Sequence, residues 1–206
     1  MNQLIAIHPD NPQQRLLNQA ADALRAGGVI VYPTDSGYAL GCHLGDKHAV
    51  ERIRKIRQLD PKHNFTLMCS DLSELSVYAK VDNVAYRILR SHTPGPYTFV
   101  LPASSEVPKR LKHPKRKTIG LRVPQNNITQ GLLAALAEPI MSVTMILPGE
   151  DLPMLDAYEI QQAIGHQVEL IIDGGFCGFE ATSIIDLSEE MPQIIRRGAG
   201  SVEAFE

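Results

Sequence analysis

The sequence predicts an α/β domain built around a mixed β-sheet. Segments with helical periodicity alternate along the chain with short apolar runs rich in β-branched residues. Several of these runs follow one another without a helix between them, so the sheet should contain both antiparallel and parallel neighbours. The chain of 206 residues is 44% hydrophobic, which is enough for a substantial core. Because no linker, repeat or low-complexity stretch divides it, we expect a single domain over residues 1–206.

Six segments are expected to be helical. The first begins at Asn11, which can cap a helix that has Pro12 at its first position, and apolar residues repeat at helical spacing until Gly27. The others are expected over residues 46–57, 71–80, 82–91, 126–137 and 156–165. Four of these begin with Asp, whose side chain can accept hydrogen bonds from the first turn.

The first strong strand is expected over residues 29–32, and it ends in an unusually polar segment. Pro33 lacks a backbone donor and is expected to end sheet pairing there. Thr34 and Ser36 follow at the end of a buried strand, where α/β proteins bind ligands, and are therefore candidate site residues. The alternative is a polar turn with Asp35 as a cap. Further strands are expected over residues 65–69, 97–101, 118–123, 140–147, 168–172, 183–187 and 193–196.

The formal net charge of −3 hides a strong partition along the chain. Residues 52–122 hold 15 of the 20 Lys and Arg but only five acidic residues, whereas the parts before and after are acidic. Such asymmetry predicts an anionic partner, either a nucleic acid or a polyphosphate, on a surface built by the middle third. The alternative is a set of solvated charges without function.

The second half of the helix expected over residues 46–57 carries four cations, Arg52, Arg54, Lys55 and Arg57. A helix C-terminus stabilises positive charge and Glu51 can pair with Arg54 or Lys55, so a solvated face is one interpretation. The other is that Lys55 and Arg57 flank a bound triphosphate as the helix ends.

Residues 109–117 form a second basic cluster, with six Lys or Arg in nine residues: Lys109, Arg110, Lys112, Lys115, Arg116 and Lys117. Pro114 prevents a regular helix, and Leu111 is the only apolar anchor, which is typical of a mobile surface loop. The run also suits sequence-independent contact with a phosphate backbone. Because few aromatic residues are interspersed, we expect double-stranded or folded RNA rather than stacked single strands.

Hydroxyl and guanidinium groups recur near the ends of other expected strands. They are Thr98, Arg122, Ser142, Thr144, Thr182, Ser183 and Arg196. A Ser or Thr in a strand is more often a satisfied edge residue. Together, however, these residues could line one concave anion-binding face, with arginines as bidentate clamps.

Other familiar machinery is missing from the sequence. Residues 41–47 lack the lysine placement of a phosphate-binding loop, and no GxSxG or HExxH motif occurs. No pair of cysteines has zinc-site spacing, and the three cysteines are expected to be reduced thiols. We expect no structural metal, no membrane segment and a cytoplasmic location.

In its ordered motifs the chain resembles the YrdC/YciO family, and most closely its YciO branch. The similarity covers nearly the whole chain. The motifs are the strand and mouth at residues 27–42, Lys55-Ile56-Arg57, the PGPxT element at 94–98, GxRxP at 120–124, and the late elements at 174–175, 182–186 and 196–198.

This resemblance implies a twisted open sheet with a basic concave face that binds nucleotide and double-stranded RNA or tRNA. It also implies an L-threonylcarbamoyladenylate synthase, which joins L-threonine, bicarbonate and ATP with Mg²⁺ and releases pyrophosphate, in tRNA modification. No protein nucleophile is then expected.

The resemblance also implies residue roles. Thr34 and Arg122 would bind threonine. The nucleotide would be bound by Lys55, Arg57, Thr98, Ser142, Thr144, Thr182 and Arg196, and RNA by Arg52, Arg54 and the cations of residues 109–117.

Two departures from the synthase pattern bear on activity. Ser142-Val143-Thr144 stands where synthases have Ser-x-Asn, and Phe65-Thr66-Leu67 stands where they usually have Lys-Pro-Leu. Two interpretations therefore remain, a synthase with weak or altered activity and a non-catalytic RNA-binding protein that uses the same basic face.

Overall fold

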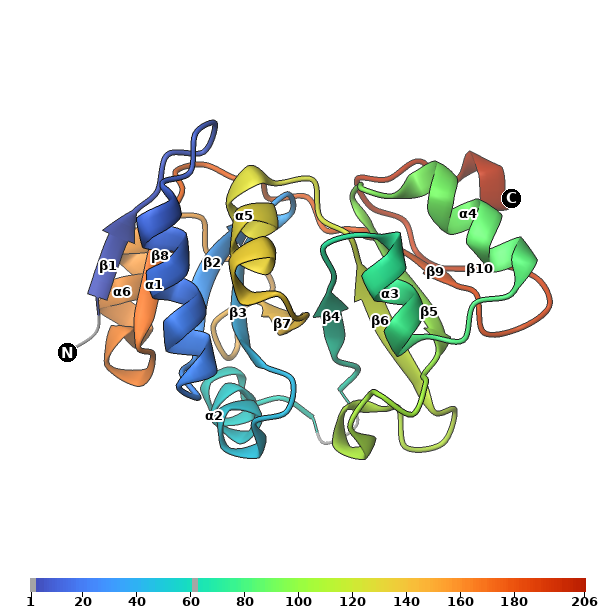
Figure 1. Cartoon of the computed structure of the whole chain (residues 1–206), viewed down its shortest axis with the longest axis horizontal. Coiled ribbons are helices and arrows are strands. Elements are labelled where there is room, and N and C mark those ends of the chain that lie inside the picture. The colour runs from blue at the N-terminus through green and yellow to red at the C-terminus, as the bar shows by residue number, and fades with distance from the viewer. Residues whose placement is uncertain (1–2, 61–62) are drawn as a thin grey trace.

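The computed structural model of the protein describes residues 3–60 and 63–206. Its strands form one ten-stranded sheet in the order β1-β8-β2-β3-β7-β4-β6-β5-β9-β10 (Figure 1). In chain order the strands are β1 (Gln3–Ala6), β2 (Ile30–Thr34), β3 (Gly37–His43), β4 (Thr66–Met68), β5 (Tyr97–Pro102), β6 (Thr118–Arg122), β7 (Ile140–Thr144), β8 (Leu170–Asp173), β9 (Ser183–Asp186) and β10 (Gln193–Arg196). Parallel and antiparallel pairs both occur, which confirms the expected α/β class with a mixed sheet.

The α-helices are α1 (Gln14–Arg25), α2 (Lys47–Arg57), α3 (Leu72–Tyr78), α4 (Asn83–His92), α5 (Asn127–Leu136) and α6 (Ala157–Ile164). Five begin after a capping side chain, as the sequence indicates. The caps are Asp46, Asp71, Asp82, Asn126 and Asp156. The start expected for α1 is wrong, because its cap is Gln13, and the preceding turn is instead organised by His8 Nδ1, which accepts from the Asp10 and Asn11 amides at 3.2 Å each.

Strand β3 is an element that the sequence did not reveal, and it changes the interpretation of Pro33. β2 and β3 form an antiparallel hairpin in which Pro33 lies opposite Tyr38 and Thr34 opposite Gly37, so pairing continues past the proline. The expectation that Pro33 ends pairing is wrong. Gly41 lies within β3, and a Cβ there would lie 2.7 Å from both the Tyr32 ring and the Ile140 side chain. The residue therefore makes room for core packing within a strand.

Two hydrophobic clusters show how the helices cover the sheet. Helices α1 and α5 pack with Ile30 and Tyr32 on one face. Helices α2 and α6 pack on the opposite face, as do α3 and α4 farther along the sheet, against Phe99 and Leu121. The cluster beneath α1 and α5 includes only Met68 of β4 and no residue of β5 or β6. In the described part of the chain, the faces of β5 and β6 opposite α3 and α4 therefore have no helix from this cluster over them. Among the described residues, no helix is both long enough and apolar enough to cross a bilayer.

Candidate anion-binding site on the open face

The bare part of the sheet, called the open face below, is defined by four residues on neighbouring strands. Ser142 of β7 lies opposite Thr66 of β4, and Thr66 lies opposite Gly120 of β6. Thr98 of β5 is close by, because a Cβ on Gly120 would lie 3.4 Å from its methyl carbon and 2.9 Å from Thr66 Oγ1. A cavity of about 180 Å³ borders Thr66, Thr98 and Gly120. Small and hydroxyl-bearing side chains thus form the floor of a hollow.

The first polar cluster of this region, the mouth cluster, comprises Thr34, Asp35, Ser36 and Arg122. Thr34 Oγ1 donates to the Gly37 carbonyl at 2.7 Å and accepts from the Ser36 amide at 3.1 Å. Arg122 Nη1 donates to Ser36 Oγ at 3.0 Å, and Nη2 donates to the Asp35 carboxylate. The structure therefore brings together Thr34 and Arg122, which the resemblance assigned to one ligand.

Asp35 does not cap a helix. Its second carboxylate oxygen accepts from the Gln125 amide at 3.1 Å, and its side chain is only 11% exposed. The Arg122 side chain is 8% exposed, and its buried Nε lacks a hydrogen-bond partner among the described residues. An unpartnered donor on a buried cation is costly, so this guanidinium is suited to receive an additional acceptor from a ligand.

The second cluster, the arginine cluster, joins Thr98, Thr182 and Arg196. The two threonine hydroxyls are 2.8 Å apart, and both side chains are buried. Arg196 Nε and Nη2 donate to the Thr182 carbonyl at 2.9 and 2.8 Å, and Nη2 also reaches Thr182 Oγ1 at 3.1 Å. Desolvation, followed by repulsion from Arg122, lowers the pKa of Arg196. The two guanidinium groups thus lie near enough for their positive charges to repel each other.

Ser142 forms the buried edge of the floor, and Thr144 stands apart from it. Tyr32 Oη donates to Ser142 Oγ at 2.7 Å, which leaves the serine proton available for another acceptor. Burial raises the pKa of Tyr32, so this phenol remains a donor at all ordinary pH values. Thr144, two residues along β7, is exposed. Thr144, which stands where synthases have the longer Asn, therefore lies at the rim of the open face rather than in its floor.

Arg57, at the end of α2, is held beside the chain that follows β7. Its Nη1 donates to the Ile146 carbonyl at 2.7 Å, while its buried Nε has no partner within the described residues. Desolvation lowers the pKa of Arg57, and the pKa of His63 is lowered by desolvation and then by Arg57 and Arg54. Positive charge is therefore in excess at this side. Lys55 is exposed and makes no ion pair in the described parts of the chain.

The cations assigned to RNA are less free than the sequence indicates. Arg52 pairs with Glu169 at 2.9 Å and donates to the Gln167 carbonyl at 2.8 Å. Arg54 lies 3.5 Å from Glu51, the pairing expected from their spacing, and stacks 4.6 Å from the Phe65 ring centroid. The acidic last third of the chain thus neutralises part of the basic middle third.

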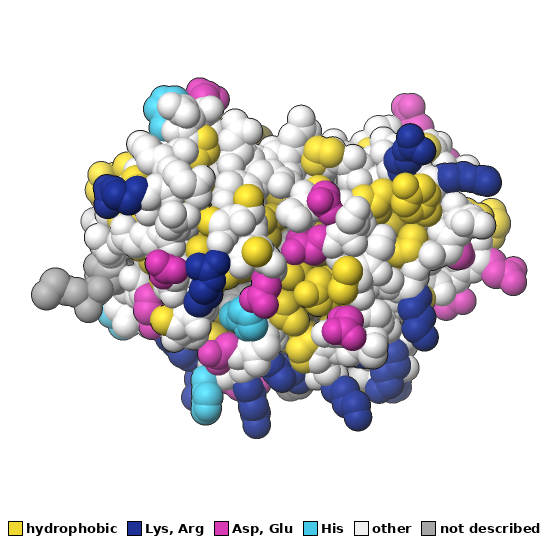
Figure 2. Space-filling view, in the orientation of Figure 1, with side chains coloured by type: hydrophobic (Ala, Val, Ile, Leu, Met, Phe, Trp, Pro, Cys, Tyr) yellow, Lys and Arg dark blue, Asp and Glu magenta, His cyan; other side chains and the backbone are white. Residues whose placement is uncertain are grey.

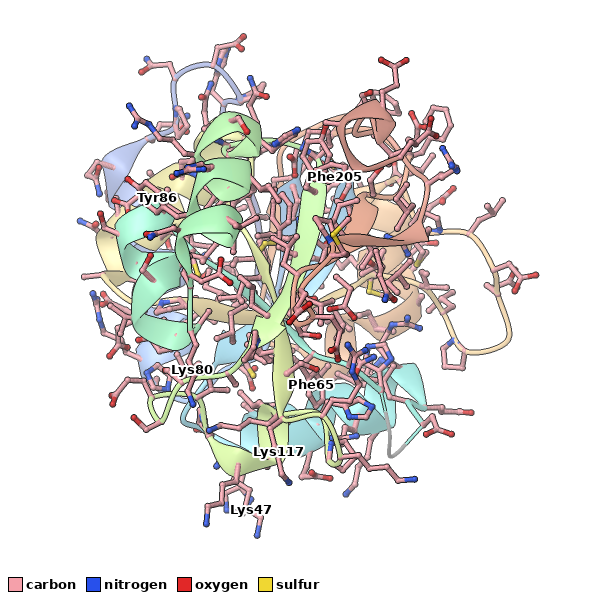
Figure 3. All side chains as sticks on the ribbon, turned by 90° about the vertical axis from the view of Figure 1, so that its right-hand side faces the viewer. Lys47, Phe65, Lys80, Tyr86, Lys117 and Phe205 are labelled. Carbon is pink, nitrogen blue, oxygen red and sulfur yellow. The ribbon has the colours of Figure 1, made fainter. Side chains whose placement is uncertain are left out.

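The basic run is also anchored by more than Leu111, contrary to the expectation of a loosely held loop. Four of its cations make hydrogen bonds within the fold. Arg110 donates to the Leu44 and Gly45 carbonyls, Lys112 to the Ser104 carbonyl and Lys117 to the Pro114 carbonyl. Arg116 donates to the Ser188 hydroxyl and forms an ion pair of 2.5 Å with the buried Asp186 carboxylate. Lys109 and Lys115 are exposed, with no side-chain hydrogen bond or ion pair to the described residues. Lys and Arg side chains still gather along the lower edge in Figure 2, and Lys47 and Lys117 project from this end in Figure 3.

Sequence reasoning missed three contributors, Asp35 as a partner of Arg122, Tyr32 beneath Ser142, and His63 beside Arg57. Asp35 and Arg122 are 87 residues apart, and Tyr32 and Ser142 are 110 apart, so no local pattern could connect them. His63 follows the helix that carries Arg57, and its closeness in sequence was a usable signal. In the described residues no group of three or more His, Cys, Asp or Glu side chains could hold a metal.

The chain is similar to known proteins over nearly its whole length. The family model Sua5_yciO_yrdC, described as telomere recombination, matches residues 22–198. The chain is 57% identical over 205 residues to the uncharacterized protein YciO of Escherichia coli K12, with both proteins fully covered. The crystal structure of E. coli YciO matches all of both chains with a TM-score of 0.96.

More distant relatives include named enzymes. The chain is 30% identical over 190 residues to a threonylcarbamoyl-AMP synthase of Pyrococcus abyssi, which covers 91% of this chain and 55% of the synthase. The crystal structure of P. abyssi Sua5 complexed with L-threonine has a TM-score of 0.91 at 26% identity, covering 98% of this chain and 59% of Sua5. The family model and these relatives match most of the chain. The chain therefore belongs to the Sua5/YciO/YrdC family.

Proposed function

We propose that the open face binds L-threonine and ATP and that the protein is an L-threonylcarbamoyladenylate synthase-type enzyme with weak or altered activity. The observation that carries this proposal is that Arg196, bound to Thr182 beside Thr98 of the hydroxyl-lined hollow, lies near enough to Arg122 to be repelled by it. In addition, Arg122 and Arg57 each carry a buried Nε donor without a partner among the described residues. The positive charge of these three arginines exceeds the negative charge that Asp35 supplies, which suits a polyanionic ligand.

Thr34 and Arg122 would bind the amino acid, with Arg122 on its carboxylate. Sua5 of P. abyssi has been solved with L-threonine, which supports an amino acid as one ligand of this fold. Asp35 already contacts Arg122, so a substrate carboxylate has to share or displace that contact. The Asp35 carboxylate can in turn accept from the substrate amine, which would favour amino acids over simple carboxylates.

Lys55, Arg57, Thr98, Ser142, Thr182 and Arg196 would bind the triphosphate, which brings Mg²⁺ with it. The threonine amine adds to carbon dioxide derived from bicarbonate and loses a proton, giving a carbamate. A carbamate oxygen then forms a bond to the α-phosphorus, and the bond from that phosphorus to the bridging oxygen breaks as pyrophosphate leaves with the electron pair. The residues supply orientation and charge neutralisation, so no protein nucleophile is required.

Thr144 is the residue that limits this proposal to weak or altered activity. It would stand at the nucleotide rim where synthases have Asn, and a hydroxyl cannot donate and accept at the reach of an amide. Because Thr144 is exposed, a ligand must come to it at the surface.

The test is incubation of the purified protein with ATP, L-threonine, bicarbonate and Mg²⁺, followed by mass spectrometry for threonylcarbamoyl-AMP and pyrophosphate. Arg57→Ala should abolish product, while Arg87→Ala, which removes an exposed arginine from α4, should leave it unchanged. Product that forms without threonine or bicarbonate, or that survives Arg57→Ala, would contradict the assignment. Thr144→Asn is expected to increase the yield.

A second candidate function is non-catalytic binding of double-stranded RNA or tRNA, in tRNA modification or elsewhere. The observation favouring it is that exposed Lys109 and Lys115 lie in the same basic run as His113 and Arg116, which border the cavity of the open face. Charge reversal at these two lysines should weaken RNA binding and lower the slope of log K against log salt by about 2. Arg87→Glu is the matched control, and an unchanged slope would reject this surface.

A further inference from the structure

The loop between β8 and β9, which packs against the turn between β2 and β3, exposes two aromatic side chains. Phe176 and Phe179 are 72% and 66% exposed, whereas Phe65 and Phe99 are almost completely buried. Exposing a phenyl ring forfeits the hydrophobic stabilisation that burial would give. Two such rings three positions apart, with centroids 6.5 Å from each other, form a small apolar surface that needs a partner.

The loop that carries the rings is held against the mouth cluster. Tyr38 Oη donates to the Gly175 carbonyl at 2.8 Å and accepts from the Gly174 amide at 3.2 Å. Gly178 has a φ of +93°, and a Cβ there would lie 3.2 Å from the Asp35 carbonyl oxygen, so the loop backbone packs directly on the turn between β2 and β3. The rings are therefore presented to solvent by an anchored backbone.

The other end of the loop enters the arginine cluster. Thr182 follows Phe179 by three residues, and it is bound both by Thr98 and by Arg196. Three residues of chain span roughly 10 Å at most, so the aromatic surface and the guanidinium of Arg196 are within reach of one ligand. An apolar aromatic surface next to a cationic one matches a molecule with a flat ring at one end and phosphate at the other.

The ring geometry suits a nucleobase. The two centroids are 6.5 Å apart with an angle of 50° between the planes. A base stacked on both sides needs a separation of roughly 7 Å, which is twice the stacking distance of about 3.4 Å, so a modest rotation of the rings would admit one. We infer that Phe176 and Phe179 form a stacking platform for a nucleobase whose phosphate lies toward Arg196. This inference rests on the proposed function in taking the phosphate to lie on the open face.

The nucleobase could belong to a mononucleotide or to an unpaired position of an RNA, and fluorescence distinguishes the two sources. The probes are 2-aminopurine riboside triphosphate and a single-stranded RNA hexamer with one 2-aminopurine, whose emission falls on stacking. Inorganic tripolyphosphate, measured by calorimetry, reports phosphate binding alone. The variant is Phe176→Leu with Phe179→Leu, which keeps apolar side chains but removes the rings. Tyr86→Leu, on α4 and 45% exposed, is the matched control (Figure 3).

The expected result is quenching of at least one probe by the wild-type protein and the control. In the double variant the affinity for that probe should fall at least about 5-fold, with tripolyphosphate binding unchanged. Quenching of the triphosphate alone assigns the rings to a mononucleotide, and quenching of the hexamer alone assigns them to RNA.

Equal affinity and equal quenching in the double variant would overturn the stacking platform, as would a wild-type protein that quenches neither probe. Failure of the proposed function gives a different pattern, because the wild-type protein would then bind neither tripolyphosphate nor the triphosphate. Quenching of the hexamer that is lost in the double variant would still support the platform in that case.

Discussion

The Arg122 guanidinium donates to the Asp35 carboxylate from the last residue of β6, across 87 residues of sequence. Both side chains are nearly buried, and Ser36 and the Gln125 amide complete the contacts on the two sides. This pair fixes the turn between β2 and β3 against β6. It therefore holds the mouth cluster against β6, one of the strands of the open face.

Removing the acidic partner should expose how strongly this pair is coupled to folding. We expect Asp35→Ala to lower the free energy of unfolding by about 3 kcal/mol, because it leaves a buried guanidinium without its counter-charge. Asp22→Ala, which breaks the exposed pair with Arg25, should cost about 1 kcal/mol or less. Urea denaturation measures both, and equal losses would show that the Asp35–Arg122 pair behaves like a surface pair.

Tyr32→Phe tests the support beneath Ser142. The variant keeps the ring that packs against Gly41 but removes the phenolic donor. We expect a loss of about 1 kcal/mol in unfolding free energy and a few-fold weaker nucleotide affinity, because Ser142 loses its fixed orientation. Thr144→Ala, on the same strand but exposed, should leave stability nearly unchanged. A stable Tyr32→Phe variant with wild-type affinity would contradict this role for the hydrogen bond.

Asp186 should make the protein sensitive to acid. Desolvation favours the neutral form of this carboxyl, but hydrogen bonds from Ser188 and Arg116 outweigh it, so its pKa lies below the ordinary value of 3.8. A depressed folded-state pKa stabilises the fold above about pH 4, and this contribution is lost as pH falls through the folded value. We expect Arg116→Gln to flatten the fall in stability below pH 4, measured by thermal unfolding at successive pH values. If the stability of the variant falls as steeply as that of the wild-type protein, Arg116 does not contribute to the acid sensitivity.

The three cysteines should react slowly in the folded protein. Burial is the main cause that raises the pKa of Cys42 to about 12 and that of Cys177 to about 11, and it raises the pKa of Cys69 as well. At pH 8 we expect iodoacetamide to label partly buried Cys177 first and all three far more slowly than a small free thiol, since the thiolate is the reacting form. Urea should abolish the difference. Rapid labelling of Cys42 without denaturant would indicate that β3 opens.

Local chemistry in the sequence determined the class of fold and most of its elements. Asp46, Asp71, Asp82 and Asp156 all cap the helices they were expected to start, because a cap depends on residues only two or three positions away. The order of motifs was also sufficient for the family resemblance, which the family match confirms. Strand β3 was not predicted, because the glycine within it, Gly41, is required by close packing against Tyr32 of the neighbouring strand, and this contact is not visible in the local sequence.

Tertiary structure alone decided which charges are free. Arg116 and Lys115 are adjacent in a run of cations, yet Arg116 is bound to Asp186, 70 residues away, whereas Lys115 remains exposed. The same holds for Arg122, whose partner Asp35 reads in the sequence as a turn residue. Counting charges along a chain gives their number, but the interaction between two charges depends on their distance and burial in space. These are set by how the strands are ordered in the sheet.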